Sequence, residues 1–301
     1  MPNTQAAWII TGPTSGIGYR TALRLAAVGP VILVGRSAER LATVQQRIER
    51  RHGHAVPVVC DLADLASVER AAAEIGSLGL PLAGLVNNAG MVTASTAPTD
   101  QGYDPTYATN FLGPFKLTEA LKSHLPDHAR VVFLCSAVED PERTPAVKAG
   151  YRGGRYLSAT ASAKGQWTPG GSTHDGYDAY ATAKQALLAS VFALAREDQR
   201  IQFTAVEPGF NPTTGLVREA PAPVRIILRF VLGPLAPFIK YWSTPARAGV
   251  VISKIATSAG HDTGTYYDEN GEPMQASRLA SDPAFQDRVV AETRALLSTA
   301  Y

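Results

Sequence analysis

The sequence predicts an α/β fold in which one doubly wound parallel sheet of about seven strands carries helices on both faces. Short runs rich in β-branched residues alternate with longer helical patterns along the chain. The short runs are continuously apolar, as in parallel strands that are buried on both faces. The length of 301 residues fits one large domain, so residues 1–301 are expected to form a single unit.

The first half of the chain alternates strictly between the two patterns. We expect strands over 7–10, 31–34, 56–59, 85–87 and 131–134, with helices over 17–28, 38–51, 65–75 and 103–124. Parallel strands need a crossover connection, which a helix of this length supplies. The order strand, helix, strand therefore predicts a doubly wound sheet.

The second half continues the pattern with two interruptions. Helices are expected over 178–196, 245–258 and 282–298, and strands over 201–206 and 265–267. Residues 140–176 contain seven glycines and three prolines without a sustained apolar period, which predicts a long loop over 137–177. The second interruption, residues 211–243, is apolar and punctuated by prolines. Loops of this length are often functional.

Composition excludes several classes of protein. Lys and Arg number 28 against 26 Asp and Glu, so the chain lacks the basic surface of a nucleic-acid-binding protein. Two cysteines cannot form a disulfide framework in a chain of this length, and they favour a reducing compartment. The N-terminus lacks the basic region of a signal peptide, and the apolar run 226–239 is too short to cross a bilayer. The sequence thus predicts a cytoplasmic protein without a transmembrane segment.

A glycine-rich turn, Thr11-Gly-Pro-Thr-Ser-Gly-Ile-Gly18, follows the first expected strand and opens the first helix. Glycines let the backbone approach a pyrophosphate, whose charge is met by the free N–H groups of the helix. The alternative is an ordinary tight turn, but the strand before it and the helix after it favour a Rossmann-type dinucleotide site. We expect cofactor contacts from Gly12, Thr14, Ser15, Gly16, Ile17 and Gly18.

The end of the second strand favours NADP(H) over NAD(H). An acidic residue there would hold the adenosine ribose of NAD, but this strand ends in Val34-Gly-Arg36. The Arg36 guanidinium suits a 2′-phosphate, unless it merely begins a solvated helix. After the third strand, Asp61 and Leu62 are placed to border the adenine, although Asp61 equally suits the N-cap of the next helix.

Further motifs follow in order: Asn87-Asn-Ala-Gly90, Asn110, Ser136, Tyr180-x-x-x-Lys184 and Pro208-Gly209. Together with the glycine-rich turn they resemble the short-chain dehydrogenase/reductase family, from about residue 7 to residue 267, and the later part is similar to its retinol-dehydrogenase-like branch. The resemblance implies that Asn87 stabilises the sheet. It also implies that the cofactor is lined by Asn88, Ala89, Gly90, Pro208 and Gly209.

Carbonyl reduction requires residues of these types. Hydride transfer leaves an alkoxide that must be protonated, and a phenol with an ordinary pKa of about 10 is a poor partner at neutral pH. Four-residue spacing places Tyr180 and Lys184 on one helical face, where the ammonium favours the phenolate and can also bond the nicotinamide ribose. Ser136 ends the fifth strand, where its hydroxyl can hold the substrate oxygen. The resemblance implies that Asn110, inside the fourth helix, holds a water that relays protons to Lys184.

The apolar segment 211–243 stands where the family places the segment that closes over the substrate. Its core, 226–242, suits a bulky apolar alcohol, ketone or aldehyde, or alternatively a peripheral contact with a membrane surface. The resemblance also points to a homo-oligomer docked through the fourth and fifth helices, which the long loop could overturn.

The sequence therefore predicts an NADP(H)-dependent oxidoreductase that interconverts a carbonyl and an alcohol. Two alternatives stay open: a nucleotide-binding sensor or scaffold without turnover, and a lyase, isomerase or epimerase on the same scaffold. A metal site is not expected, because the sequence has no zinc pattern and His174 and Asp175 are too isolated to form one.

Overall fold

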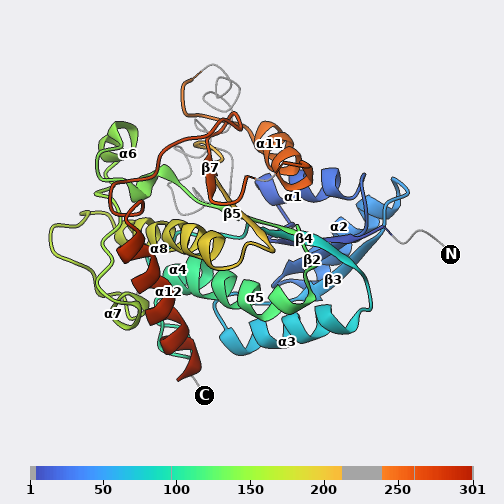
Figure 1. The fold of residues 1–301 in the computed structure, drawn as a ribbon, viewed down its shortest axis with the longest axis horizontal. Helices are drawn as coiled ribbons and strands as arrows, with labels where there is room; N and C mark the ends of the chain where they lie inside the picture. Colours follow the sequence, from blue (N-terminus) through green and yellow to red (C-terminus); the bar gives the residue numbers. More distant parts are fainter. Residues whose placement is uncertain (1–4, 96, 212–238, 261, 300–301) are drawn as a thin grey trace.

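The computed structural model describes residues 5–95, 97–211, 239–260 and 262–299 of the chain. Within these residues, seven parallel strands form one sheet in the order β3-β2-β1-β4-β5-β6-β7. They are β1 (Ala7–Thr11), β2 (Val31–Gly35), β3 (Ala55–Val59), β4 (Leu82–Asn87), β5 (Arg130–Leu134), β6 (Gln202–Val206) and β7 (Thr265–Tyr267). The strand order runs outward in both directions from β1 and β4, and helices cover both faces (Figure 1). The predicted fold class is confirmed.

The helices form a layer on each face of the sheet (Figure 1). One layer contains α1 (Gly16–Leu25), α2 (Ala38–Glu49) and α11 (Pro245–Thr257). The other contains α3 (Leu65–Ser77), α5 (Gly113–Leu121), α8 (Tyr177–Glu197) and α12 (Pro283–Ser298). Successive side chains of β1 serve both layers, since Ile9 packs into the core under the second layer and Ile10 into the core under the first. The sheet is buried on both faces, which is why its strands are continuously apolar.

Polar side chains begin several of these helices. Ser37, Asp64 and Thr244 each accept a hydrogen bond from a backbone N–H in the first turn of α2, α3 and α11. Because Asp64 is the N-cap of α3, the alternative that Asp61 caps this helix is wrong.

The fourth predicted helix, 103–124, is not continuous. It divides into α4 (Pro105–Tyr107), a π-helical turn η1 (Ala108–Leu112), α5 and a 3-10 turn η2 (Lys122–His124). Pro114 has no N–H to donate within the helix, and the Asn110 side-chain amide donates to the Thr106 carbonyl at 2.7 Å. The Asn110 side chain thus bonds to the backbone one turn earlier in the helix, and π turns often occur at functional sites.

The region 137–177 has more regular structure than the predicted long loop. It contains η3 (Ala137–Glu139), α6 (Thr144–Lys148) and α7 (Ala159–Ala163). The buried Tyr156 donates its hydroxyl to Glu292 of α12 at 2.8 Å, and Trp167 lies 5.9 Å from Tyr107 between ring centroids. These aromatic side chains fix the segment to the core. The short helices were not predicted because the segment contains many glycines and no sustained apolar period.

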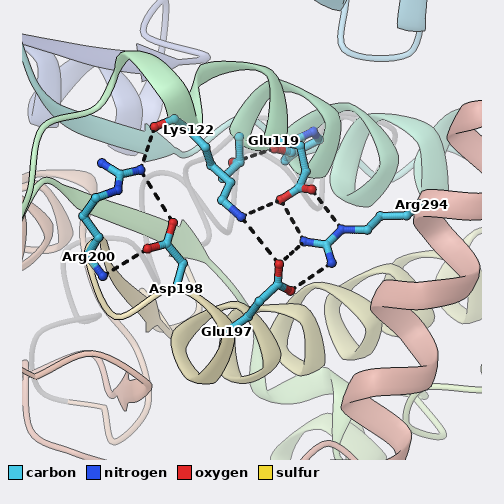
Figure 2. Close-up of polar contacts among 8 residues, drawn as sticks. Glu119, Lys122, Glu197, Asp198, Arg200 and Arg294 are labelled. Atoms are coloured by element: carbon cyan, nitrogen blue, oxygen red, sulfur yellow. Dashed lines mark hydrogen bonds and ion pairs between the residues drawn. The ribbon is translucent and has the colours of Figure 1, made fainter.

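Ion pairs join α12 to α5 and α8 (Figure 2). The Arg294 guanidinium of α12 donates to Glu119 of α5 and to Glu197 of α8, at 2.9 Å in each case. Lys122 contacts the same two carboxylates at 3.3 and 3.9 Å. α12 therefore covers part of the surface through which the family resemblance implies an oligomer, and the oligomer stays a prediction.

Residues 212–238, most of the predicted substrate-closing segment 211–243 and most of the apolar run 226–242, lie outside the described residues. The residues on either side of 212–238 meet beside β6. The Phe210 N–H donates to the Tyr241 carbonyl at 2.8 Å, and the Phe210 and Trp242 ring centroids are 4.9 Å apart. Among the described residues, no helix has the length and apolar character to cross a membrane.

Candidate functional site

A cleft of about 280 Å³ lies at the carboxyl ends of the strands, where the turns after β1 to β6 meet. Every residue predicted to bind the cofactor lines it except Gly209: these are Gly12, Thr14, Ser15, Gly16, Ile17, Gly18, Arg36, Asp61, Leu62, Asn88, Ala89, Gly90, Tyr180, Lys184 and Pro208. Arg40, Met91 and Thr109 also line it, and the sequence analysis did not identify them. Only Arg40 had a signal, because it stands one helical turn after Arg36.

The two residues that follow β4 fix the shape of the glycine-rich turn. The Thr11 hydroxyl accepts the N–H groups of Asn88 and Ala89, each at 3.0 Å, and the Asn88 amide donates to the carbonyls of Thr11 and Gly12 at 2.8 and 3.2 Å. A Cβ on Gly18 would lie 2.2 Å from that amide nitrogen and 2.3 Å from the Gly12 carbonyl oxygen. The amide of Asn88 therefore shapes the turn, and no larger residue fits at Gly18.

The first helix begins without a side-chain cap. Ser15 is the N-cap of α1, yet its hydroxyl accepts none of the first N–H groups. The positive end of a ten-residue helix therefore faces the cleft beside Gly12 and Gly16. This arrangement suits an anionic group such as a pyrophosphate.

Arg36 pairs with Asp61, an interaction that the sequence analysis did not predict. Its guanidinium lies 4.0 Å from the Asp61 carboxylate, and both side chains are more than 40% exposed. A long, exposed ion pair of this kind contributes little and yields easily to a stronger anion. The second Asp61 oxygen accepts the Ala63 N–H at 3.0 Å, which fixes the turn after β3.

Tyr180 and Lys184 lie on one face of α8, as their spacing predicts, and both are buried. The Lys184 ammonium is 5.6 Å from the centre of the Tyr180 ring and donates to the Leu134 carbonyl at 2.6 Å. That bond anchors Lys184 to the end of β5. The two side chains therefore reach the cleft from a helix that is fixed to the sheet.

Burial sets the ionisation of this pair. It raises the pKa of Tyr180 well above the ordinary value, an effect that the hydrogen bond from Ser136 only partly offsets. Burial also lowers the pKa of Lys184. The expectation that the Lys184 ammonium favours the phenolate stays a prediction, because burial dominates the pKa of Tyr180 in the protein alone. Tyr180 keeps its proton at neutral pH and is a proton donor in this state.

Asn110 occupies the π turn next to Gly90. Its amide donates to the Met91 carbonyl at 2.7 Å as well as to Thr106, and its oxygen accepts the Met91 N–H at 3.1 Å. A Cβ on Gly90 would lie 2.7 Å from this oxygen and 3.8 Å from the Lys184 ammonium nitrogen. Asn110 therefore lies near Lys184, with its amide hydrogens already used. The proton relay that the resemblance implies stays a prediction.

Ser136 follows β5 and interacts with Tyr180 on one side and with Glu207 on the other. Glu207 comes directly after β6, is 9% exposed, and accepts the N–H groups of Ala137 and Gly209. The sequence analysis did not identify Glu207. The available signal was its place immediately before Pro208-Gly209, where a carboxylate follows a buried strand.

The long segment 137–177 forms an aromatic wall beside Tyr180. Tyr151 stacks on Tyr177 with ring centroids 4.1 Å apart and lies 6.4 Å from Tyr180. His174 lies 5.0 Å from Tyr177. The segment thus contributes to the surroundings of the predicted catalytic tyrosine.

Thiol and metal chemistry find no support in the part of the chain that is described. Burial raises the pKa of Cys60 and of Cys135 to about 12, so both thiols stay protonated. The described residues contain no cluster of three or more His, Cys, Asp or Glu side chains suited to a metal ion.

Comparison with known proteins gives consistent results. The family pattern described as short chain dehydrogenase matches residues 6–149. Polyprenol dehydrogenase of Danio rerio is 29% identical over 96% of this chain and 86% of its own length. Polyprenol dehydrogenase of Mus musculus is 40% identical, but that match spans only 36% of this chain and 34% of the relative.

Among solved structures, a blue fluorescent protein from a metagenomic library, crystallised in complex with NADPH, superposes with a TM-score of 0.65. The two chains are 24% identical, and the match covers 90% of this chain and 98% of the other. At this identity the similarity concerns the fold.

Proposed function

We propose that this chain is an oxidoreductase of the short-chain dehydrogenase family that interconverts a carbonyl and an alcohol with NADP(H) as cofactor. The observation that carries the proposal is the position of Tyr180 and Lys184 in the lining of the cleft, with Ser136 as a hydrogen-bond partner of Tyr180. When bound, NADP(H) supplies or accepts the hydride. The residues of this chain provide the binding, the polarisation and the proton.

Tyr180 is the acid in the reductive direction. Its raised pKa keeps the proton on the phenol until an alkoxide forms beside it. Ser136 holds the same oxygen by a hydrogen bond, which strengthens as negative charge develops. Lys184 contributes a cation anchored to Leu134, near enough to offset that charge as the proton leaves Tyr180.

The cleft suits a dinucleotide phosphate. The uncapped N-terminus of α1 offers free N–H groups, and Gly18 leaves room where any side chain would collide with the turn. Arg36 and Arg40 line the adenosine end and favour a 2′-phosphate over a free ribose hydroxyl. The NADPH bound to the blue fluorescent protein, whose fold is similar, supports the same cofactor.

Arg36→Ala tests the choice of cofactor. We expect it to weaken NADPH binding about tenfold and to leave NADH binding within about twofold, because a charge-assisted bond to the 2′-phosphate is lost. Titration by nucleotide fluorescence measures both affinities. The exposed Arg24→Ala, which removes an equal charge outside the cleft, serves as the matched control. Equal loss for both nucleotides would refute the 2′-phosphate contact.

Gly18→Ala tests the glycine-rich turn. The new methyl group collides with Gly12 backbone, so the turn must shift, and a displacement of about 1 Å can weaken a positioned interaction about a hundredfold. We expect a loss of that order in NADPH affinity with the fold retained by circular dichroism. Gly260→Ala is the control, since its Cβ meets no atom closer than 3.6 Å. Unchanged affinity in Gly18→Ala would show that the cofactor binds elsewhere.

The substrate is proposed to be a bulky apolar alcohol, aldehyde or ketone. The zebrafish relative is named for polyprenol, a long apolar alcohol. Tyr151 stacks on Tyr177 and lies near Tyr180, which lines the cleft, and the exposed Phe210 follows the cleft residue Pro208 by two positions. A panel of apolar and polar carbonyls, and of polyprenols for the reverse reaction, tests this by absorbance of NADPH. Turnover of polar sugars alone would refute an apolar substrate.

Two further outcomes of the panel are informative. Tight NADPH binding without turnover of any compound would favour a sensor or scaffold. Conversion of a substrate without net change in NADPH would favour a lyase or epimerase.

The buried, free cysteines support a cytoplasmic location, which cell fractionation tests.

A further inference from the structure

The start of η3 has an unusual cap. Ser136 is the N-cap residue of this short helix, with extended backbone angles, and serine side chains at such positions usually accept the helix's own first N–H groups. Here the Ser136 hydroxyl makes no such bond. The N–H of Ala137, the first residue of η3, donates to the carboxyl of Glu207, which comes from the neighbouring strand end.

Glu207 is held firmly enough to act as this cap. Its own N–H donates to the Tyr267 carbonyl of β7 at 2.7 Å, and its second carboxyl oxygen accepts the Gly209 N–H at 3.1 Å. β5 and β6 are paired up to the Cys135 N–H, which donates to the Val206 carbonyl at 2.9 Å. The carboxyl therefore has a fixed position between the turn after β5 and the turn after β6.

The consequence concerns the Ser136 hydroxyl. A serine side chain has three staggered positions, and one of them turns the hydroxyl back onto the helix start. The Glu207 carboxyl, fixed by the N–H groups of Ala137 and Gly209, is a hydrogen-bond partner of this hydroxyl and holds it away from the helix start, beside Tyr180. This is the position that substrate polarisation requires.

We propose that Glu207 is a positioning residue that fixes the start of η3 through the Ala137 N–H and holds the Ser136 hydroxyl beside Tyr180. The predicted effect on kcat rests on the proposed function, whereas the predicted effect on the Ser136 side chain can be tested without turnover. Glu207 does not touch the substrate in this scheme, and it acts only through Ser136.

The test is a double-mutant cycle with Ser136→Ala. We expect Glu207→Ala to lower kcat about tenfold in the wild-type background and less than about twofold in the Ser136→Ala background. We expect KM for NADPH to change less than about twofold. Glu207→Gln keeps one acceptor oxygen for the Ala137 N–H and loses the acceptor for the Gly209 N–H. Because Ser136 is held on the Ala137 side, this variant should retain kcat within about threefold. Equal losses from Glu207→Ala in both backgrounds would overturn the proposal, because Glu207 would then act independently of Ser136.

A crystal structure of Glu207→Ala supplies the second measurement. We expect the Ser136 hydroxyl to turn toward the N–H groups of η3 and to leave hydrogen-bonding distance of Tyr180. An unchanged Ser136 would overturn the proposal, whether or not the enzyme is active. If the wild type converts no carbonyl or alcohol, the proposed function fails, and this structure still decides the role of Glu207. If Glu207→Ala does not fold, the same two measurements are made on Glu207→Leu and Glu207→Gln, and loss of kcat in the first alone supports the proposal.

Discussion

Tyr180→Phe is expected to lower kcat for carbonyl reduction about 1,000-fold while the affinity for NADPH changes less than about twofold. The substitution removes one oxygen from a buried ring and keeps its packing on α8 and its place above Lys184. The lost group is the proton donor proposed for the alkoxide. Binding of the dinucleotide depends mainly on the glycine-rich turn and on Arg36, which the substitution does not touch. Steady-state kinetics with the best carbonyl of the panel and a fluorescence titration measure the two quantities.

Tyr19→Phe is the matched control for this experiment. Tyr19 lies on α1, does not line the cleft, and loses only a hydrogen bond from Arg47. Its kcat should stay within about twofold of wild type. Retention of more than about a tenth of the activity in Tyr180→Phe would assign the proton to another group. Loss of NADPH binding together with turnover would show a structural role for the phenol.

The fold was predictable from the sequence because its signals are local. Continuous apolar strands, the glycine-rich turn and four-residue spacing on one helix each concern residues that are close in the chain. The predicted positions of Tyr180 and Lys184 on one face of α8 follow from helical geometry alone. The glycine-rich segment 137–177 was harder, because α6 and α7 are held by contacts with distant elements, such as that of Tyr156 with Glu292.

The contacts of the site that the sequence did not predict are made between residues that strand pairing brings together. Glu207 matters because β6 lies between β5 and β7, so that its carboxyl reaches Ala137 some seventy positions earlier in the chain. The place of Glu207 before Pro208-Gly209 is a local signal, but no local pattern indicates its contact with Ala137. The raised pKa of Tyr180 has the same origin, since it results from burial by the surrounding elements, whereas the spacing of Tyr180 and Lys184 suggested only the opposing effect of a nearby cation. Sequence reasoning identified the residue types, and tertiary packing decided their ionisation.

The buried carboxyl group of Glu139, close to Ser136 in the chain, predicts how the free energy of unfolding depends on pH. Glu139, at the end of η3, is 1% exposed and accepts the Ser277 N–H at 2.9 Å and the Ser277 hydroxyl at 2.5 Å. Burial raises the pKa of Glu139 to about 7, despite these two hydrogen bonds. The bonds link the segment after β7 to the turn that carries Ser136, so the ionisation of Glu139 bears on the stability of this side of the site.

The unfolded chain releases the Glu139 proton near pH 4.5, whereas the folded protein keeps it until about pH 7. The contribution of the protonated group to stability is therefore complete below pH 4.5 and is lost as the pH rises to about 7. The free energy of unfolding should fall by about 3 kcal/mol over this interval from Glu139 alone. Glu139→Gln cannot ionise and should lack this decrease, while its amide still serves Ser277 as acceptor and donor. The exposed Glu142→Gln should keep the wild-type dependence. Urea denaturation of the three proteins at pH 5, 6, 7 and 8 measures the difference, and a constant gap between wild type and Glu139→Gln across that range would contradict the assignment.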